Sequence, residues 1–348
     1  MSLHVGYLRA AVTLPPEDLP GLMRHFYKKI NTCKNVEAFV KHQVTLFWKK
    51  DRNVTAKLFK LLYSDFSLEE CKVFSYVDEL ISEIGLVQGC DASILLDGSN
   101  TEKTAAQNSG LGERIFEIID KIKTVLEIRC PRAVSCADIL NLAARDAAHL
   151  AGAPSYPVFL GRRDGLESNA TWVDYPSPSS SWDTVETYFN TKGLDQQDLV
   201  TLLGAHTLGR THCQFIRDRL YNFSNTGKPD PSMDKSLLKD LRQQCPPSAP
   251  NGKEDTLVYL NPKNGPQYKF TNTYYKQVES HQSVLGVDQQ ALWGNYSLVD
   301  VYANYFEQFR REFALSINRM GGLKVLTGKK GEIRRNCRFT NGKNPSIK

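Results

Sequence analysis

The sequence lacks several features that would assign it to a simple class. It has no Cys-x-x-Cys pair, no apolar run long enough to cross a membrane, no internal repeat and no cluster of basic residues. We therefore expect neither a zinc site of the finger type, nor a membrane span, nor a nucleic-acid partner. Aromatic residues make up 10% of the chain and charged residues 24%, a composition that excludes collagen and extended disorder.

A clear secretory leader is also missing. Residues 1–14 are interrupted by His4, Gly6 and Arg9, whereas a signal peptide needs an unbroken apolar core of about 7–15 residues. Either the leader is absent from this chain or it is degenerate. The formal charge of +6 is modest and permits only a loose affinity for polyanions.

Cysteine is abundant instead. The chain has eight cysteines at wide spacings, an even number. This pattern favours disulfides formed in an oxidising, extracellular compartment. Four Asn-x-Ser/Thr sequons agree with a secreted glycoprotein, although such triplets are common by chance; they begin at Asn53, Asn169, Asn222 and Asn295.

Apolar periodicity predicts a mainly α-helical protein with only short strands. One helix is expected over residues 115–126. A second should begin at Ser135, where Asp138 takes the Glu position of a capping box, and should run through Leu150 to a stop at Gly152.

Two further helices are expected in the second half of the chain. Asp195 and Asp198 predict a capping box for a helix that reaches Leu203. Near the C-terminus one buried aromatic stripe should end at the glycine pair 321–322. Its members are Tyr302, Tyr305, Phe306, Phe309, Phe313, Ile317 and Met320.

A histidine follows the helix that ends near Leu203. His206 has small neighbours on both sides, such as Gly204 and Gly209, which would leave room for a large flat group. A hydrogen-bonded core histidine is the alternative interpretation of this residue taken alone.

An ordered series of motifs makes the chain resemble plant secretory (class III) haem peroxidases. The resemblance covers about residues 24–341. The matching stretches are FY (26–27), GCDASILLD (89–97), EK (102–103), VSCADIL (134–140), AARD (143–146), LGRRD (160–164), GAHT (204–207), RLYNF (219–223), VDQ (287–289), LTG (326–328) and GEIR (331–334).

The resemblance implies a fold of about ten helices in two lobes with haem b between them. The distal lobe would span about residues 23–170 and the proximal lobe about 171–341, after an N-terminal segment 1–22 and before a tail 342–348. It further implies a secreted, monomeric enzyme of the cell wall or vacuole that reduces hydrogen peroxide, oxidises small phenols and serves the response to oxidative stress.

The same resemblance implies three disulfides, Cys33–Cys130, Cys136–Cys337 and Cys213–Cys245. A fourth family pair would join Cys90 to a cysteine directly after the distal Asp. Phe66 stands at that position here, so Cys71 is the only candidate partner left.

On the proximal side the family's pair of residues is complete. His206 matches the axial haem ligand, and Asp288 matches the carboxylate that hydrogen-bonds its second ring nitrogen. The chemistry needs both residues, because the carboxylate fixes the tautomer and increases electron donation to iron.

The distal side departs from the family. Lys60 replaces an Arg and Ser64 replaces a His, while Tyr63 takes a Phe position. Lysine keeps the charge but loses the planar fork, and serine has no pKa near 7 with which to move a proton. Asn108, which would hydrogen-bond the distal His, keeps its place but is expected to have nothing to orient and to support only a loop.

An insertion follows at once. Asp65 and Val87 are separated by residues 66–86, where the family has two residues. The extra stretch predicts an acidic amphipathic helix with a capping box at Ser67 and Glu70 and an end at Gly85. We expect it to lie across the peroxide entrance; a gene-model error, such as a retained intron, is the alternative.

The resemblance also implies two calcium sites. The distal one would use Asp65, Asp91, Ser93 and the carbonyls of Val87 and Gly89, which are oxygen ligands of the kind that calcium prefers, although the insertion could displace Asp65.

The proximal calcium site keeps Thr207, but its two Asp positions fall near Asn261 and at Thr271, so weak or no binding is expected. Pro176 matches a proline beside the family's aromatic-donor site; alone, it predicts only a stiff turn.

Three functions follow from these residues. The first is a haem peroxidase, impaired because the distal pair is replaced. The second is a catalytically inactive pseudo-peroxidase that holds haem or a wall polymer. The third is a scaffold without haem, should the insertion prevent the distal lobe from folding.

Overall fold

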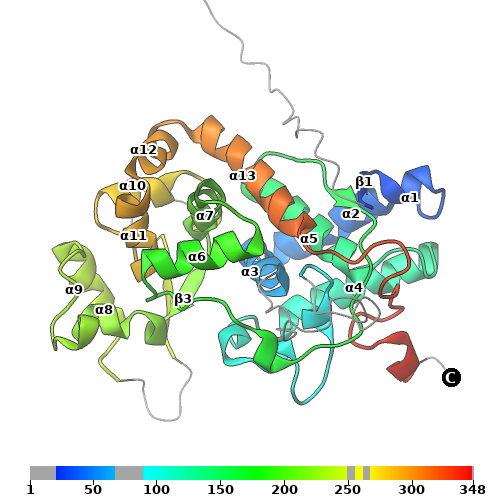
Figure 1. Ribbon diagram of the computed structural model, residues 1–348, viewed down its shortest axis with the longest axis horizontal. Coiled ribbons are helices and arrows are strands. Elements are labelled where there is room, and N and C mark those ends of the chain that lie inside the picture. The colour runs from blue at the N-terminus through cyan, green and yellow to red at the C-terminus, as the bar shows by residue number, and fades with distance from the viewer. Residues whose placement is uncertain (1–20, 67–88, 249–254, 262–266, 347–348) are drawn as a thin grey trace, which may run out of the picture.

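The computed structural model describes residues 21–66, 89–248, 255–261 and 267–346, and in them helices dominate (Figure 1). This confirms the predicted mainly α fold. The α-helices are α1 (Phe26–Lys29), α2 (Val36–Lys50), α3 (Val54–Phe66), α4 (Glu113–Arg129), α5 (Cys136–Ala151), α6 (Trp182–Lys192), α7 (Gln196–Leu203), α8 (Arg217–Tyr221), α9 (Lys235–Gln244), α10 (Thr273–Glu279), α11 (Gly286–Gly294), α12 (Tyr296–Asn304) and α13 (Phe306–Gly322).

The strands are short and form two antiparallel pairs. β1 (Met23–Arg24) pairs with β2 (Phe159–Leu160), and β3 (Arg210–His212) pairs with β4 (Leu257–Tyr259). Short 3-10 turns complete the regular structure, including η2 (Ser93–Leu95), η4 (Ala106–Asn108) and η6 (Gly204–Thr207).

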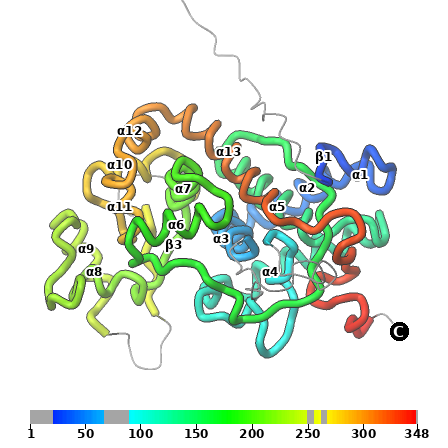
Figure 2. Tube along the Cα trace, in the orientation of Figure 1, coloured from blue at the N-terminus to red at the C-terminus, as the bar shows by residue number. Residues whose placement is uncertain are grey.

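The helices gather in two groups that α13 joins. Helices α2, α3, α4 and α5 pack together, while α6, α7, α10, α11 and α12 pack on the other side; α13 contacts both α7 and α3 (Figure 1). After α13 the chain returns to the first group, and in Figure 2 its red C-terminal segment lies on the same side of the molecule as β1 and α4. Two isolated bridges, Arg163 with Leu326 and Asp164 with Glu332, fix this return.

Helix α5 forms the centre of the first group because its surface is apolar and small. Most of its residues are buried, several of them alanines that allow close approach by α2 and α3. As predicted, the Ser135 hydroxyl accepts a hydrogen bond from the Asp138 amide, and Gly152 ends the helix with a left-handed φ of 109°.

The second half of the predicted capping box is absent from α5. The Asp138 carboxylate does not return to the Ser135 amide; it accepts from Tyr27 (2.6 Å), from the Gly161 amide (2.7 Å) and from Arg162 (2.9 Å). The Tyr27 hydroxyl accepts from the Ser135 amide in its place. At α7 the box between Asp195 and Asp198 is complete in both directions, as predicted.

The single aromatic stripe expected near the C-terminus is wrong, because two helices share it. The helix breaks at Tyr305, whose backbone is non-helical (φ −119°, ψ 79°) between α12 and α13 and which is 63% exposed. Tyr302, Phe309 and Phe313 are buried as predicted. Periodicity alone cannot show this break, since the apolar spacing continues across it.

The three implied disulfides are present as Cys33–Cys130, Cys136–Cys337 and Cys213–Cys245. Cys90 is buried, and its thiol donates to the Met320 carbonyl (3.4 Å). The proposed partner Cys71, the predicted inserted helix, Val87 and most of the N-terminal segment lie outside the described residues. Among the residues that are described, no helix is both long and apolar enough to span a bilayer.

Candidate haem site

The proximal side is built around His206, on the short turn η6 that directly follows α7. Its Nδ1 lies 2.8 Å from Oδ1 of Asp288, near the start of α11, and the Tyr274 hydroxyl donates to the same oxygen (3.2 Å). Burial disfavours the imidazolium, but the charge and hydrogen bond of Asp288 outweigh burial, so the pKa of His206 is raised above its ordinary value. Asp288 thus holds the ring with Nδ1 protonated and Nε2 available.

The small residues beside His206 have separate reasons to be small. A Cβ on Gly204 would lie 2.5 Å from the Tyr275 hydroxyl and 2.6 Å from the Phe309 ring, so close packing alone requires glycine there. Gly209 has a φ of 94°, and a Cβ on it would lie 3.1 Å from that of Ala56 on α3. The segment after His206 therefore lies beside the helix that carries Lys60, one turn beyond Ala56.

On the distal side, α3 brings Lys60 and Ser64 together, one helical turn apart. Ser64 is fully buried; its hydroxyl makes no hydrogen bond of good geometry among the described residues, but it interacts with the nearby Tyr175 hydroxyl. Lys60 is half-buried, and its Nζ donates to the hydroxyl of Tyr175 (2.5 Å). Burial lowers the pKa of Lys60 to about 7.

Asn108 holds a phenol where the family would have an imidazole. Its Nδ2 donates to the Glu102 carbonyl (2.9 Å), and its Oδ1 accepts from the Tyr175 hydroxyl (3.1 Å). The same hydroxyl lies 2.5 Å from the Gln107 carbonyl. The expectation that Asn108 has nothing to orient is therefore wrong.

Tyr175 is the residue of the distal side that sequence reasoning missed. It lies on the loop before α6, next to Pro176, which is half-buried. Its ring packs 5.5 Å from that of Tyr63. No local pattern signals this role, because Tyr175 and Lys60 are 115 positions apart.

Those residues of the expected distal calcium site that the structure describes, which exclude Val87, lie close together at the end of α3. Asp65 is fully buried; its Oδ2 accepts from the Ala92 amide (3.0 Å), its carbonyl accepts from the Cys90 amide (3.3 Å), and its Oδ1 has no hydrogen-bond partner among the described residues. Asp91 Oδ1 accepts from the Ser93 amide (3.0 Å).

A close backbone approach and raised carboxyl pKa values characterise this calcium-site cluster. Gly89 passes the last turn of α3, where a Cβ would lie 3.2 Å from the Phe66 carbonyl. Burial, then the charge of Asp91, raises the pKa of Asp65 to about 8, and burial raises that of Asp91 to about 6. Within the described ranges no group of three His, Cys, Asp or Glu side chains has metal-ligating geometry, so a cation here would depend on hydroxyl and carbonyl oxygens as well.

The expected proximal calcium position is filled by neutral groups that bond to one another. Thr207 Oγ1 lies 3.0 Å from Thr271 Oγ1, which lies 2.8 Å from Thr273 Oγ1. Asn261 donates to the Thr207 carbonyl (3.4 Å) and accepts from Gln277 (3.0 Å). These contacts satisfy the polar groups without a cation.

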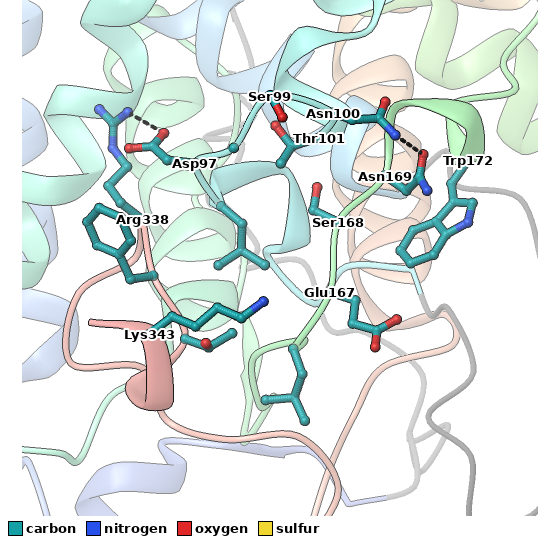
Figure 3. Close-up of a pocket in the computed structure, with 15 residues that line it drawn as sticks. Asp97, Ser99, Asn100, Thr101, Glu167, Ser168, Asn169, Trp172, Arg338 and Lys343 are labelled. Atoms are coloured by element: carbon teal, nitrogen blue, oxygen red, sulfur yellow. Dashed lines mark hydrogen bonds and ion pairs between the residues drawn. The ribbon is translucent and has the colours of Figure 1, made fainter. Parts of the chain in front are cut away.

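A hollow elsewhere on the molecule has a different lining (Figure 3). It lies between residues 96–101, 166–172 and 338–343 and contains none of the distal or proximal residues described above. Asn100 donates to Asn169, one of the four sequon asparagines, and Arg338 forms an ion pair with Asp97.

The side chains present fit haem on the proximal side. Asp288 occupies one nitrogen of His206, while the side chain remains 32% exposed, which leaves Nε2 as the nitrogen that could bind iron. A mainly helical fold with a carboxylate-backed histidine beside α3 is the arrangement expected of the class of helical haem peroxidases.

Comparison with known proteins agrees. The family model described as "Peroxidase" matches residues 37–310. The chain is 51% identical to "Probable peroxidase 26" of Arabidopsis thaliana over 95% of this chain and 93% of that protein, and 54% identical to "Probable peroxidase 61" of the same plant over 92% and 88%. It is 39% identical to "Peroxidase 57", also of Arabidopsis thaliana, over 91% of each chain. The chain therefore belongs to the plant secretory (class III) peroxidase family.

Proposed function

We propose that this chain is a haem-binding peroxidase whose reaction with hydrogen peroxide is impaired. The observation that carries the proposal is the contrast between its two sides: His206 and Asp288 form a complete proximal pair, whereas Lys60 and Ser64 stand in place of the distal Arg and His. When bound, haem b would supply the iron that reduces peroxide and that then accepts electrons from phenols.

The proximal residues of this chain would serve the reaction better than the distal residues. His206 would bind the iron through Nε2, and Asp288 would keep the ring oriented and electron-rich. Lys60 can stabilise developing negative charge but lacks the bidentate geometry of arginine. Ser64 cannot shuttle a proton, and loss of such a group costs roughly 10²–10⁴ in rate.

A haem protein without turnover is the second candidate, and one contact favours it. The Tyr175 hydroxyl lies between Lys60 and Asn108, so it occupies part of the distal side where a peroxide would need partners.

An absorbance spectrum of the purified protein, before and after peroxide is added, tests the proposal. A Soret band that His206→Ala abolishes and slow turnover of a phenol would support it. A Soret band without turnover at any practical peroxide concentration selects the second candidate. Absence of a Soret band after haem reconstitution overturns both and selects the scaffold without haem.

Restoring the family's distal pair gives a second test. Lys60→Arg with Ser64→His should raise turnover. Tyr175→Phe should be added in a further variant, because the Tyr175 hydroxyl occupies the Asn108 oxygen that the new imidazole needs. If haem-loaded protein stays inert in both variants, the distal substitutions are not the cause of impairment.

We also propose one calcium ion at the distal cluster, held by Asp65, Asp91, Ser93 and backbone carbonyls that include Gly89. Among the described residues Oδ1 of Asp65 has no hydrogen-bond partner, and this supports the proposal, since a buried carboxylate oxygen needs a donor or a cation. No calcium is proposed at Thr207 and Thr271.

We infer that the protein is secreted as a monomer. Its three disulfides form readily only in an oxidising compartment. Asn222 is the sequon asparagine that lies exposed and so suits a glycan. Pro176 would border the path of a small phenolic donor, beside Tyr175.

A further inference from the structure

The distal side contains an amine and a phenol that replace the expected guanidinium and imidazole. Lys60 Nζ lies 2.5 Å from the Tyr175 hydroxyl, 4.1 Å from the centre of the Tyr175 ring and 5.8 Å from that of Tyr63. Asn108 and Gln107 hold the phenol from the other side.

Hydrogen-bond chemistry fixes the direction of each bond in this group. A phenol has one proton to donate, and the Gln107 carbonyl and the Asn108 Oδ1 can only accept. The Tyr175 proton is therefore committed to them, and the phenol oxygen must accept from Lys60. A neutral Lys60 amine uses one N–H in this bond and keeps its lone pair for another donor.

The surroundings favour a neutral amine near physiological pH. No carboxylate of the described residues lies within ion-pair distance of Lys60; the groups that face it are Tyr63 on its own helix and Tyr175 from the loop. His206 is the other nearby titratable group, and the charge of Lys60 opposes protonation there. Burial lowers the pKa of Lys60 to about 7, so a proton can enter and leave under mild conditions.

We propose that Lys60 is the proton acceptor of the distal side and that Tyr175 is its positioning residue, itself anchored by Asn108 and Gln107. The inference rests on the proposed haem binding. An acidic ligand H–X loses its proton to Lys60 Nζ: the H–X bond breaks, an N–H bond forms, and X⁻ is left beside the resulting ammonium. Hydrogen peroxide and hydrogen cyanide both belong to this class of ligand.

Cyanide binding to the haem-loaded protein, followed by absorbance from pH 5 to 9, tests the step without turnover. Affinity of the unaltered protein should rise with pH and level off above about 7, once Lys60 is neutral. Lys60→Met should bind ~10- to 100-fold more weakly near pH 7.5, because X⁻ loses a charged hydrogen bond. The affinity of Lys60→Met for cyanide should rise over the whole range from pH 5 to 9, because hydrogen cyanide must then lose its proton to solvent and not to Lys60.

Two further variants separate a proton acceptor from a mere positive charge. Lys60→Arg keeps the charge but cannot accept a proton, so its pH profile should follow that of Lys60→Met. Tyr175→Phe removes the acceptor of the ammonium, which should shift the levelling to lower pH and weaken binding. Lys49→Met and Tyr296→Phe, both at exposed positions, are the matched controls and should leave the profile unchanged.

The outcomes separate this inference from the function on which it rests. Absence of a Soret band in the unaltered protein overturns the proposed function and this inference with it. A Soret band with coincident pH profiles for the unaltered protein, Lys60→Met and Lys60→Arg overturns this inference alone. A Tyr175→Phe profile and affinity equal to those of the unaltered protein remove Tyr175 from the assignment. Circular dichroism of each variant confirms that it is folded.

Discussion

At the scale of single residues, the proximal pair is the most constrained part of the candidate site. Asp288 is buried and receives two donors, His206 and Tyr274, on one oxygen. A carboxylate in this position both orients the imidazole and raises its basicity. An amide of the same size can accept a hydrogen bond but carries no charge.

Asp288→Asn therefore should weaken haem binding by ~10- to 100-fold, the usual cost of losing such a partner. Titration of the protein without haem, followed at the Soret band, measures the affinity. Asp300→Asn on α12 makes the same change away from His206 and should have no effect. Equal affinities for the two variants would show that Asp288 does not support the ligand.

Asp65 is the single residue on which a dependence of thermal stability on calcium should rest. A ligand that binds only the folded protein stabilises it by about 2.7 kcal/mol at one hundred times its dissociation constant. A chelator should therefore lower the melting temperature of the unaltered protein, and Asp65→Asn should lose most of this response. Thr271→Val in the neutral proximal network should keep it. A melting temperature indifferent to calcium in the unaltered protein would contradict the distal site.

At the scale of elements, the N-terminus of α5 joins three parts of the chain. The Asp138 carboxylate takes hydrogen bonds from Tyr27 before α2 and from Gly161 and Arg162 after β2, all in a buried environment. The helix cap thus depends on Ser135, and the contact between distant segments depends on Asp138, three positions further on. Losing the one should cost a different unfolding free energy from losing the other.

Ser135→Ala removes the cap and the long contact of its Oγ with the Tyr27 hydroxyl (3.4 Å), and should cost about 1 kcal/mol of unfolding free energy. Asp138→Asn leaves Arg162 without its carboxylate and should cost more, about 3–5 kcal/mol, the range for a broken buried ion pair. Urea denaturation gives both values. Glu117→Gln, at an exposed position on α4, serves as the control. The opposite ranking would mean that the cap, and not the carboxylate network, holds this end of α5.

These elements also show how far a sequence alone can lead. Caps at Ser135 and Asp195 were predictable, because a cap depends on residues three positions apart. The contact between His206 and Asp288 was predictable from motifs that the family shares. Tyr175 was not, since its partners are set by tertiary packing across the chain. Tyr305 was misassigned because an apolar period does not register a backbone break.

At the scale of the whole molecule, the disulfides hold the C-terminal return in place. Cys136–Cys337 joins residues that are 201 positions apart. Cys213–Cys245 joins residues that are 32 positions apart and lies inside the longer loop. Cys136 is the first residue of α5, so the longer bridge ties the end of the chain to the helix at the centre of the first group. The bridges Arg163–Leu326 and Asp164–Glu332 lie on the same return and reinforce it.

Removing the longer bridge by Cys136→Ala with Cys337→Ala should therefore cost more than removing the shorter one. The chain-entropy model gives a stabilisation of about 5 kcal/mol for the disulfide that closes the long loop and about 4 kcal/mol for the one that closes the short loop. The first value changes little if the short loop, which lies inside the long one, stays closed by its own disulfide. Urea denaturation of the two double variants compares them. Amide exchange should locate the loosening of the first variant in residues 323–341 and the start of α5, and that of the second around α8 and α9. Equal losses with exchange spread over both groups would mean that packing along α13, and not the covalent link, holds the return.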